Sequence, residues 1–225
     1  MKIGALISGG KDSLYAAYKE SKKHELVCLI SLKSKRDDSY MFHIPNIHLV
    51  KQIAESMELP LIFIESSGIK EKELDDLEKA IKIAVKKYKV GGIVSGAIKS
   101  NYQKQRVDKI CEKIGLMSIA PLWHIDEERY MNELIKDKFK VIITGIAAEG
   151  LDRNFLGKSI DKRIIEKLKK INKGNNLHIS GEGGEFETLV LDCPLYKKRI
   201  EIRKFKIKME NACTGCYIIK KVRLA

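Results

Sequence analysis

Residues 8–13 read Ser-Gly-Gly-Lys-Asp-Ser and place hydroxyl, ammonium and carboxylate groups around two bare backbone positions. The apolar run KIGALI precedes them, and a run with apolar residues at helical spacing follows. Glycine lacks a Cβ atom, so the chain can turn sharply and present N–H groups to a ligand. A strand, a glycine turn and a helix N-terminus together form an anion site suited to phosphate. We expect this whole loop to bind phosphate: Ser8, Gly9, Gly10, Lys11, Asp12 and Ser13.

Within this loop, Lys11 would supply positive charge, and Asp12 would orient the loop or help to hold Mg²⁺. A plain tight turn between a strand and a helix is the alternative. Three other loops are excluded. The Walker pattern G-x-x-x-x-G-K-[ST] fails because position 5 is Ala and position 12 is Asp. The dinucleotide fingerprint G-x-G-x-x-G and the nucleophile elbow G-x-S-x-G are both absent.

Alternating strands and helices are expected to position this loop. Apolar runs at 2–7, 25–32, 59–65, 90–96 and 140–146 read as five buried strands, separated by amphipathic helical segments. This alternation predicts an α/β fold with a five-stranded, parallel, doubly wound sheet. Ligands of such sheets lie beyond the carboxyl ends of the strands. Those ends read SGG, SLKS, SGA and TG, at 8–10, 31–34, 95–97 and 144–145, so Ser31, Ser95 and Gly96 are predicted to contact the ligand as well.

The pattern changes after about residue 150. A charged helix at about 161–171 precedes a glycine-rich stretch and two further apolar runs. Apolar residues alternate with charged ones over 200–209, with a slip near Arg203 and Lys204 that is typical of a β-bulge. We expect a smaller C-terminal α+β region with antiparallel strands. The predicted domains are 1–148 and 149–225, without a low-complexity linker between them.

Composition narrows the class of protein. The 225 residues carry a formal charge of +13, which attracts polyanions, but Lys and Glu are abundant together, as in proteins from hot environments. We interpret many of the lysines as solvated helix faces and do not expect nucleic-acid binding. No apolar run reaches the ~20 residues that span a bilayer, and Gly9 to Asp12 interrupt the only early one. We therefore expect a soluble cytoplasmic protein. A homo-oligomer is left open.

The loop resembles a known signature. S-G-G-x-D-S after the first strand is the pyrophosphate loop of the ATP pyrophosphatase superfamily, and Ser8, Gly9, Gly10, Asp12 and Ser13 match it. The resemblance implies a HUP-like (adenine nucleotide alpha hydrolase-like) domain that binds ATP and splits it between the α- and β-phosphates. A substrate oxygen would attack the α-phosphorus, forming an adenylate and releasing pyrophosphate.

Four further stretches resemble the diphthine–ammonia ligase family: SYMFHIPN (39–46), the run at 95–116, PLW (121–123) and GEGGEFETLVLDCP (181–194). This resemblance spans about residues 1–200. It implies an ATP- and Mg²⁺-dependent ligase that adenylates the carboxylate of diphthine on translation elongation factor 2. Ammonia would then attack, giving diphthamide, AMP and pyrophosphate. Residues 1–148 would bind ATP, and 149–225 would bind the substrate.

The stretch GEGGEFET concentrates negative charge beside glycines. Diphthine carries a trimethylammonium group, and ammonia arrives partly as ammonium. With the resemblance, we assign Glu182 and Glu185 as catalytic residues that bind a cation or deprotonate ammonium, and Glu187 as a substrate-binding residue. A glycine-rich loop with solvated acids is the alternative, and composition alone favours it.

Several other residues are candidates for substrate contacts, each against a structural alternative. Tyr102 and Trp123 would offer aromatic faces to the trimethylammonium group, although core packing competes. Arg106 would reach phosphate, or lie on a helix surface. The remaining candidates are His43, Asn46 and Gln103. For His43, a packing or capping role is equally consistent with the sequence.

Two other functions stay open. A tRNA-modifying ATP pyrophosphatase would suit the basic surface, and a non-catalytic nucleotide-binding module would suit the fold. The pair Cys213 and Cys216 has C-x-x-C spacing, but metal sites usually need two more ligands. We expect neither metal nor sulfur chemistry there.

Overall fold

The computed structural model describes residues 1–34, 46–66, 72–175 and 177–225. The chain divides into two compact units, Met1–Trp123 and His124–Ala225, called here the first and the second unit. Among the described helices, none is both long and apolar enough to cross a membrane.

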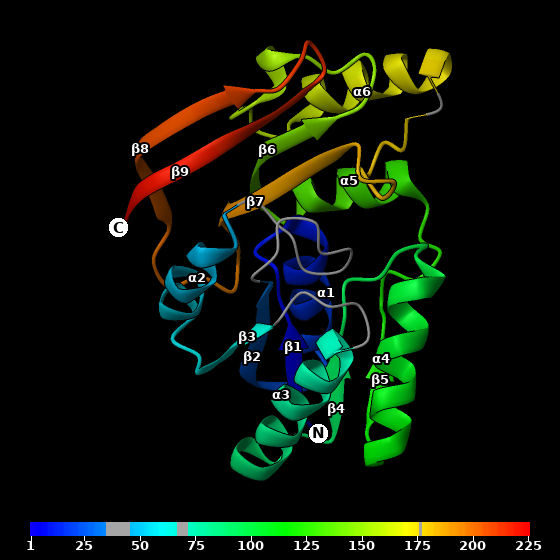
Figure 1. Cartoon of the computed structure of the whole chain (residues 1–225), viewed down its shortest axis with the longest axis vertical. Coiled ribbons are helices and arrows are strands. Elements are labelled where there is room, and N and C mark those ends of the chain that lie inside the picture. Colours follow the sequence, from blue (N-terminus) through cyan, green and yellow to red (C-terminus); the bar gives the residue numbers. More distant parts are fainter. Residues whose placement is uncertain (35–45, 67–71, 176) are drawn as a thin grey trace. The chain divides into compact units, whose positions relative to one another are not determined.

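The first unit contains a parallel sheet whose strands have the order β3-β2-β1-β4-β5 (Figure 1). Ala5 of β1 pairs with Leu29 of β2 on one side and with Val94 of β4 on the other. The elements are β1 (Lys2–Leu6), α1 (Lys11–Ser21), β2 (Glu25–Ser34), the 3-10 turn η1 (Ile47–Leu49), α2 (Val50–Met57), β3 (Leu61–Ser66), α3 (Lys72–Tyr88), β4 (Gly92–Val94), α4 (Asn101–Ile114) and β5 (Met117–Ile119). The predicted five-stranded, parallel, doubly wound sheet is confirmed.

Apolar residues at helical spacing hold α3 and α4 on one face of this sheet. Leu77 and Ile81 of α3 and Ile110 of α4 share a buried cluster with β2 and β4. Helix α1 instead contacts β1, β2 and β4 and buries Leu14 outside that cluster. Two local devices add to the burial: the Ser100 hydroxyl accepts a hydrogen bond from the Gln103 N–H at the start of α4, and Gly115 ends α4 in a left-handed conformation.

One predicted strand of the parallel sheet is wrong. The fifth parallel strand is β5, at Met117–Ile119, and the run at 140–146 belongs to the second unit. That run forms β6 (Lys140–Ala147), which pairs antiparallel with strands on both sides. Six of its residues are buried, so its sequence reads as an apolar run like a parallel strand. The TG at 144–145 consequently lies within β6, and the division at His124 differs from the predicted boundary at 148.

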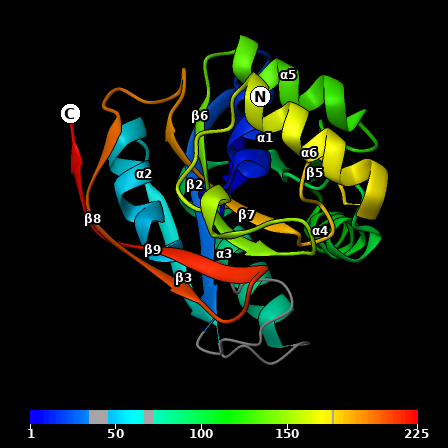
Figure 2. The same ribbon diagram turned by 90° about the horizontal axis from the view of Figure 1, so that it is seen from above.

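The second unit is built on an antiparallel sheet with the order β7-β6-β9-β8. Its elements are α5 (Glu127–Lys136), β6, the 3-10 turn η2 (Arg153–Phe155), α6 (Lys162–Asn175), β7 (Phe186–Asp192), β8 (Ile200–Met209) and β9 (Thr214–Leu224). Figure 2 shows β8 and β9, in orange and red, side by side as a long hairpin. Its register shifts on both sides of Lys204, which confirms the predicted irregularity near Arg203 and Lys204.

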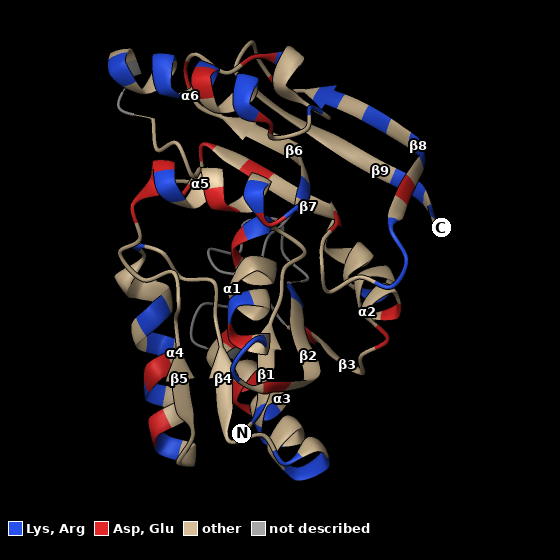
Figure 3. Cartoon of the chain, turned by 180° about the vertical axis from the view of Figure 1, so that it is seen from behind, with Lys and Arg blue, Asp and Glu red and all other residues tan. Residues whose placement is uncertain are grey.

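Charges of opposite sign alternate on several helices (Figure 3). Lys82 pairs with Glu78 at 2.7 Å on α3, and Lys104 pairs with Asp108 at 2.6 Å on α4, each across one helical turn. In the second unit, Lys169 of α6 joins Glu128 of α5 at 2.7 Å. These pairs support the interpretation of many lysines as parts of solvated, ion-paired helix faces.

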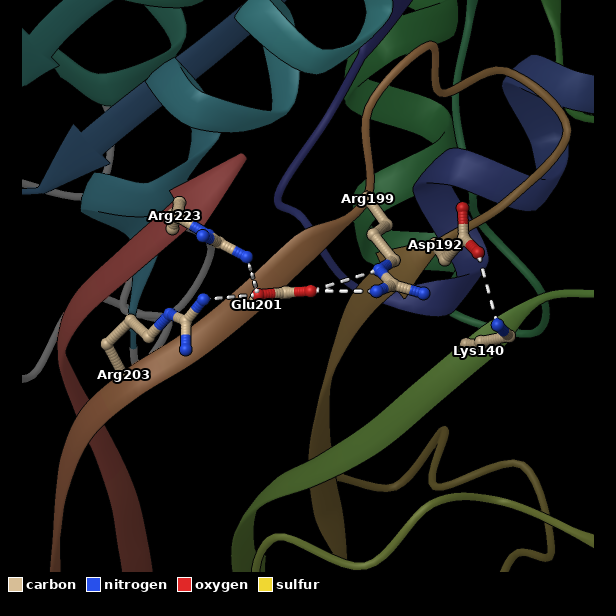
Figure 4. A network of polar contacts seen from close by, with 6 residues as sticks. All are labelled: Lys140, Asp192, Arg199, Glu201, Arg203 and Arg223. Atoms are coloured by element: carbon tan, nitrogen blue, oxygen red, sulfur yellow. Dashed lines mark hydrogen bonds and ion pairs between the residues drawn. The ribbon is translucent and has the colours of Figure 1, made fainter. Parts of the chain in front are cut away.

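The Glu201 carboxylate forms hydrogen bonds with three arginines at the β8–β9 hairpin (Figure 4). Glu201 accepts hydrogen bonds from Arg199 and Arg203 at 2.8 and 2.7 Å, and from Arg223 of β9 at 2.8 Å. The hydrogen bonds from Arg199 and Arg223 hold the pKa of Glu201 below its ordinary value of 4.5. The ionised carboxylate therefore offsets repulsion between guanidinium groups that lie close together.

Glu201→Gln is expected to lower the melting temperature at neutral pH and to have no effect in acid. Because its pKa is depressed in the folded state, Glu201 stabilises the fold above the ordinary pKa, and this stabilisation is lost as the pH falls through the depressed value. Thermal unfolding of both proteins across this range is the measurement. Glu210→Gln, an exposed change on the same hairpin, is the control. A difference that persists undiminished in acid would contradict the charge-based explanation.

Candidate functional site

The glycine turn lies where β1 ends and α1 begins. Gly9 has φ 87°, a conformation that favours glycine, and Gly10 caps the helix in an extended conformation without a side-chain cap. The first turn of any helix has backbone N–H groups without an intrahelical acceptor. The start of α1 therefore combines the positive end of the helix dipole with a glycine that carries no capping side chain. This geometry suits a phosphate.

The two serines of the loop hold its shape. Ser8 Oγ accepts a hydrogen bond from the Gly10 N–H at 3.3 Å, and Ser13 Oγ accepts one from the Ser8 N–H at 3.2 Å. Ser13 Oγ also donates to the Gly10 carbonyl at 3.1 Å. The sequence suggested hydroxyl donors toward a ligand, whereas the structure shows these hydroxyls bonded within the loop. They fix the turn in which the N–H groups are presented.

Lys11 and Asp12 place a charge pair at the first turn of α1. The Lys11 side chain is only 2% exposed, and its Nζ lies 3.0 and 3.1 Å from the two carboxylate oxygens of Asp12. The Asp12 side chain is 31% exposed. A buried ammonium group is costly unless it is paired, and here the Asp12 carboxylate provides that pairing beside the phosphate-type loop.

Gly96 follows β4 and lies directly against this loop. A Cβ atom at Gly96 would come within 2.6 Å of the Asp12 carbonyl carbon and the Ser13 nitrogen. The strand order reverses between β1 and β4, and such a reversal is where doubly wound sheets bind ligands. The structure thus brings the predicted residue Gly96 together with the predicted loop.

Three buried serine hydroxyls in the first unit have no hydrogen-bond partner among the described residues. They belong to Ser66, at the end of β3, and to the predicted site residues Ser31 on β2 and Ser95 after β4, which are 2% and 8% exposed. Buried hydroxyls normally have a partner. Ser31 and Ser95 were predicted from their places at the carboxyl ends of strands, and their unused donors fit a polar ligand such as a nucleotide.

Three of the predicted substrate residues near α4 already have interaction partners within the first unit. The Arg106 guanidinium lies over the Tyr102 ring, 3.3 Å from its centroid, and donates to the Tyr102 carbonyl. Lys104 Nζ lies 5.5 Å from the Trp123 ring centroid. Both aromatic rings thus have a cation of the protein at one face. Gln103, also on α4, is exposed.

Two predicted residues come from the stretch at 39–46. Asn46 is buried and precedes the 3-10 turn η1 with φ 67°. His43 lies outside the described residues. Asn46 therefore has a conformation that asparagine tolerates better than most residues do, which is consistent with a local structural role as well as with substrate contact.

The glycine-rich stretch of the second unit forms a turn before β7. Gly181 and Gly184 have φ of 71° and 85°. Glu185 accepts a hydrogen bond from the His178 N–H at 2.8 Å through Oε1, whereas its buried Oε2 has no partner among the described residues. The half-buried Glu182 lies within the turn, and Glu187 lies on β7 opposite Gly145 of β6. The acids therefore have different environments.

Two residues of this region were not among those predicted. Glu127, the first residue of α5, has Oε1 2.9 Å from His178 Nδ1, and its Oε2 accepts the Ser180 N–H at 3.1 Å. The two residues are 51 positions apart in sequence, so no spacing rule connects them. The sequence feature that could have pointed to this pair is His178, which lies three residues before the first glycine of GEGG.

Thiol chemistry finds little support in the cysteines. Burial raises the pKa of Cys28 and Cys193 to about 12 and that of Cys111 to about 11. Cys213 and Cys216 both hold free thiols, and burial raises the pKa of Cys216 as well. The thiolate is the reactive form, so these shifts oppose a nucleophilic role near neutral pH for four of the five.

A divalent metal would find few protein ligands in the described part of the chain. Its His, Cys, Asp and Glu side chains nowhere gather in a group of three that could hold an ion. Mg²⁺ is often bound by one or two carboxylates together with phosphate oxygens and waters. The part-exposed carboxylate of Asp12, at the phosphate-type loop, fits that kind of site.

Both halves of the chain match models of one family. Residues 1–118 match the diphthamide synthase N-terminal domain, and residues 126–224 match the diphthamide synthase C-terminal domain. The second match extends past residue 200, where the resemblance seen in the sequence ended. The two matched segments also correspond closely to the two compact units.

Curated relatives agree with the family models. The chain is 34% identical to diphthine–ammonia ligase of Mus musculus, over 94% of this chain and 86% of that protein, and equally so to that of Homo sapiens. It is 36% identical to the enzyme of Schizosaccharomyces pombe, over 97% of this chain and 39% of that longer protein. A solved structure, described as a predicted subunit of tRNA methyltransferase from Methanocaldococcus jannaschii, has TM-score 0.44 and 16% identity, over 86% of this chain and 98% of that one. The family models and the curated relatives show that the chain belongs to the diphthamide synthase family.

Proposed function

We propose that this chain is a carbon–nitrogen ligase that uses ATP to convert the carboxylate of diphthine, on translation elongation factor 2, into the amide of diphthamide. The observation that carries the proposal is the glycine turn at the start of α1, with nearly buried Lys11 beside Asp12 and with Gly96 packed against it. The name of the curated relatives, diphthine–ammonia ligase, indicates diphthine as the acceptor and ammonia as the nucleophile.

The chemistry would proceed in two steps. A carboxylate is a poor acyl donor until its oxygen becomes part of a good leaving group. Its attack on the α-phosphorus would form an acyl-adenylate and release pyrophosphate, and ammonia would then displace AMP. The glycine turn and Lys11 would stabilise the negative charge of the departing pyrophosphate. Asp12 would hold Mg²⁺, which would offset charge on the phosphates.

The first unit would therefore carry the adenylation chemistry. Ser31 and Ser95 would use their unpartnered hydroxyls as polar contacts to the nucleotide. Ser8 and Ser13 would act by holding the turn, because their hydroxyls are bonded within it. The second unit would carry the carboxylates that bind the cationic reactants, namely the trimethylammonium group of diphthine and ammonium.

Glu185→Gln is expected to lower amidation at least about tenfold while ATP binding stays unchanged. Its Oε2 is buried without a partner among the described residues, and a charged hydrogen bond from a cationic reactant would be worth roughly 1.5–3 kcal/mol. Glu182→Gln is expected to act in the same direction. The measurement is amide formation by mass spectrometry, beside ATP titration. Undiminished turnover in both variants would exclude the role of these acids.

One assay separates the proposed function from its alternatives. Protein, ATP and ammonium are incubated with diphthine-bearing elongation factor or with unmodified tRNA. The proposal expects AMP, pyrophosphate and conversion of acid to amide on the factor alone. Products formed with tRNA alone would support the tRNA-modifying enzyme. ATP binding without turnover on either substrate would support a nucleotide-binding module.

A further inference from the structure

The second unit contains a carboxylate–imidazole pair that connects α5 to the glycine-rich turn. Glu127 Oε1 lies 2.9 Å from His178 Nδ1, and the side chain of Glu127 is 13% exposed, against 43% for His178. We propose that His178, oriented by Glu127, is the general base that takes a proton from ammonium before the nitrogen attacks. This inference rests on the proposed function and deepens it, because it names the group that generates the nucleophile.

The pair fixes which nitrogen of the ring can act. An ionised carboxylate only accepts hydrogen bonds, so Nδ1 must carry the proton that it shares with Glu127. Nε2 of the neutral ring then has the free lone pair, on a side chain that is nearly half exposed. A carboxylate that holds a histidine in one tautomer also stabilises the imidazolium that forms when the other nitrogen takes up a proton.

The backbone around His178 is held by the same acids. The His178 N–H donates to Glu185 Oε1 at 2.8 Å, and the Ser180 N–H donates to Glu127 Oε2 at 3.1 Å. The Gly181 N–H bonds to the His178 carbonyl at 2.9 Å. Glu127 thus binds both the ring of His178 and the backbone two residues further on. The position of the imidazole follows from these bonds rather than from a flexible surface loop.

The surroundings favour a small cation. The charged groups that the structure records around His178 are both acidic: Glu127 from α5, and Glu185 from the residue before β7. Two buried oxygens in the same turn, Glu185 Oε2 and Ser180 Oγ, have no partner among the described residues, and Ser180 is 0% exposed. From α6, Lys169 contributes a cation that is held by Glu128 and Glu166. An ammonium ion could donate hydrogen bonds to both of these oxygens.

The proton step balances simply. Ammonium loses one proton to His178 Nε2 and keeps the electron pair of that N–H bond, which gives neutral ammonia. The imidazolium passes the proton to solvent. The lone pair of ammonia then forms the C–N bond as the C–O bond to AMP breaks, and the attached nitrogen releases one more proton to solvent, which leaves the neutral amide. Without the base, only the small fraction of ammonia that is already free near neutral pH can react.

The test compares two nucleophiles on the full-length protein with diphthine-bearing elongation factor. Ammonium needs a base near neutral pH, whereas hydroxylamine is already largely unprotonated. His178→Gln is expected to lower amide formation from ammonium about 10²-fold, with hydroxamate formation and the pyrophosphate release of the first turnover unchanged. Glu127→Gln, which removes only the orienting group, is expected to lower it about tenfold. For both variants the deficit should shrink as the pH is raised, because free ammonia becomes abundant.

Glu128→Gln, one residue along α5 and part of the pair with Lys169, is the matched control and is expected to leave both reactions unchanged. Equal losses with ammonium and hydroxylamine, or a deficit that does not change with pH, would assign His178 a structural role and overturn the proposal. Full ammonium activity in His178→Gln would overturn it as well. A failure of the proposed function looks different, because the unmodified protein itself would form neither amide nor hydroxamate.

Discussion

Gly96→Ala is expected to lower ATP-dependent pyrophosphate release at least about 10²-fold, although it adds a single methyl group. The new Cβ would lie 2.6 Å from the Asp12 carbonyl carbon and the Ser13 nitrogen, and 2.8 Å from the Ser13 Cα. These are backbone atoms, so no flexible side chain can move aside. The start of α1 must shift away from β4, and a displacement of ~1 Å at a positioned group can cost about 10² in rate.

The change should also lower the melting temperature, since overpacking costs about 1–3 kcal/mol. Pyrophosphate release and thermal unfolding are therefore measured together. Gly91→Ala is the control: it precedes the same strand and is exposed, and its added Cβ would have Met1 Sδ as the nearest atom at 3.7 Å. Wild-type kinetics in Gly96→Ala would show that α1 and β4 do not together form the ATP site.

The parallel sheet could be predicted from sequence because most of its strands are apolar runs between amphipathic helices. The exception is instructive. β5 has only three residues, one of them serine, and none is fully buried, so its sequence carries neither an alternating pattern nor an apolar run. β6 is flanked by β7 and β9 and buried along most of its length, so it reads as a parallel strand. Pairing partners, which the local sequence does not specify, decide between these two sheets.

The site shows the same division between local and distant information. The glycine turn is one short stretch, so its residue types alone predict its geometry. The structure adds that Gly96 lies directly against this turn. The pair of Glu127 and His178 joins a helix start to a turn 51 residues away, and only the fold brings them together. Tyr102 and Trp123 show the converse: their residue types suit a cation, but Arg106 and Lys104 of the chain itself are already beside the rings.

Lys11→Met is expected to lower adenylate formation about 10²–10³-fold, which is the usual loss when one preorganised donor to a developing charge is removed. Lys11 is the nearly buried cation of the phosphate-type loop, and methionine fills a similar volume without a charge. The measurement is exchange of labelled pyrophosphate into ATP in the presence of diphthine-bearing factor and without ammonium. That readout isolates the first step from the attack of the nucleophile.

The melting temperature of Lys11→Met should not fall with its activity, and this distinguishes a loss of catalysis from simple unfolding. Burying an ammonium group costs desolvation energy that its pairing with Asp12 only partly offsets, and replacing buried charge by apolar volume is often neutral or stabilising. Asp12 remains solvated, since its side chain is 31% exposed. Lys11→Met should therefore melt no lower than the wild type while exchange collapses, and Lys19→Met, on the last turn of the same helix, should change neither. If Lys11→Met exchanges pyrophosphate at the normal rate, the charge of Lys11 serves the fold rather than the phosphates. If exchange is lost while stability is undiminished, the fold tolerates a buried lysine because the reaction requires it.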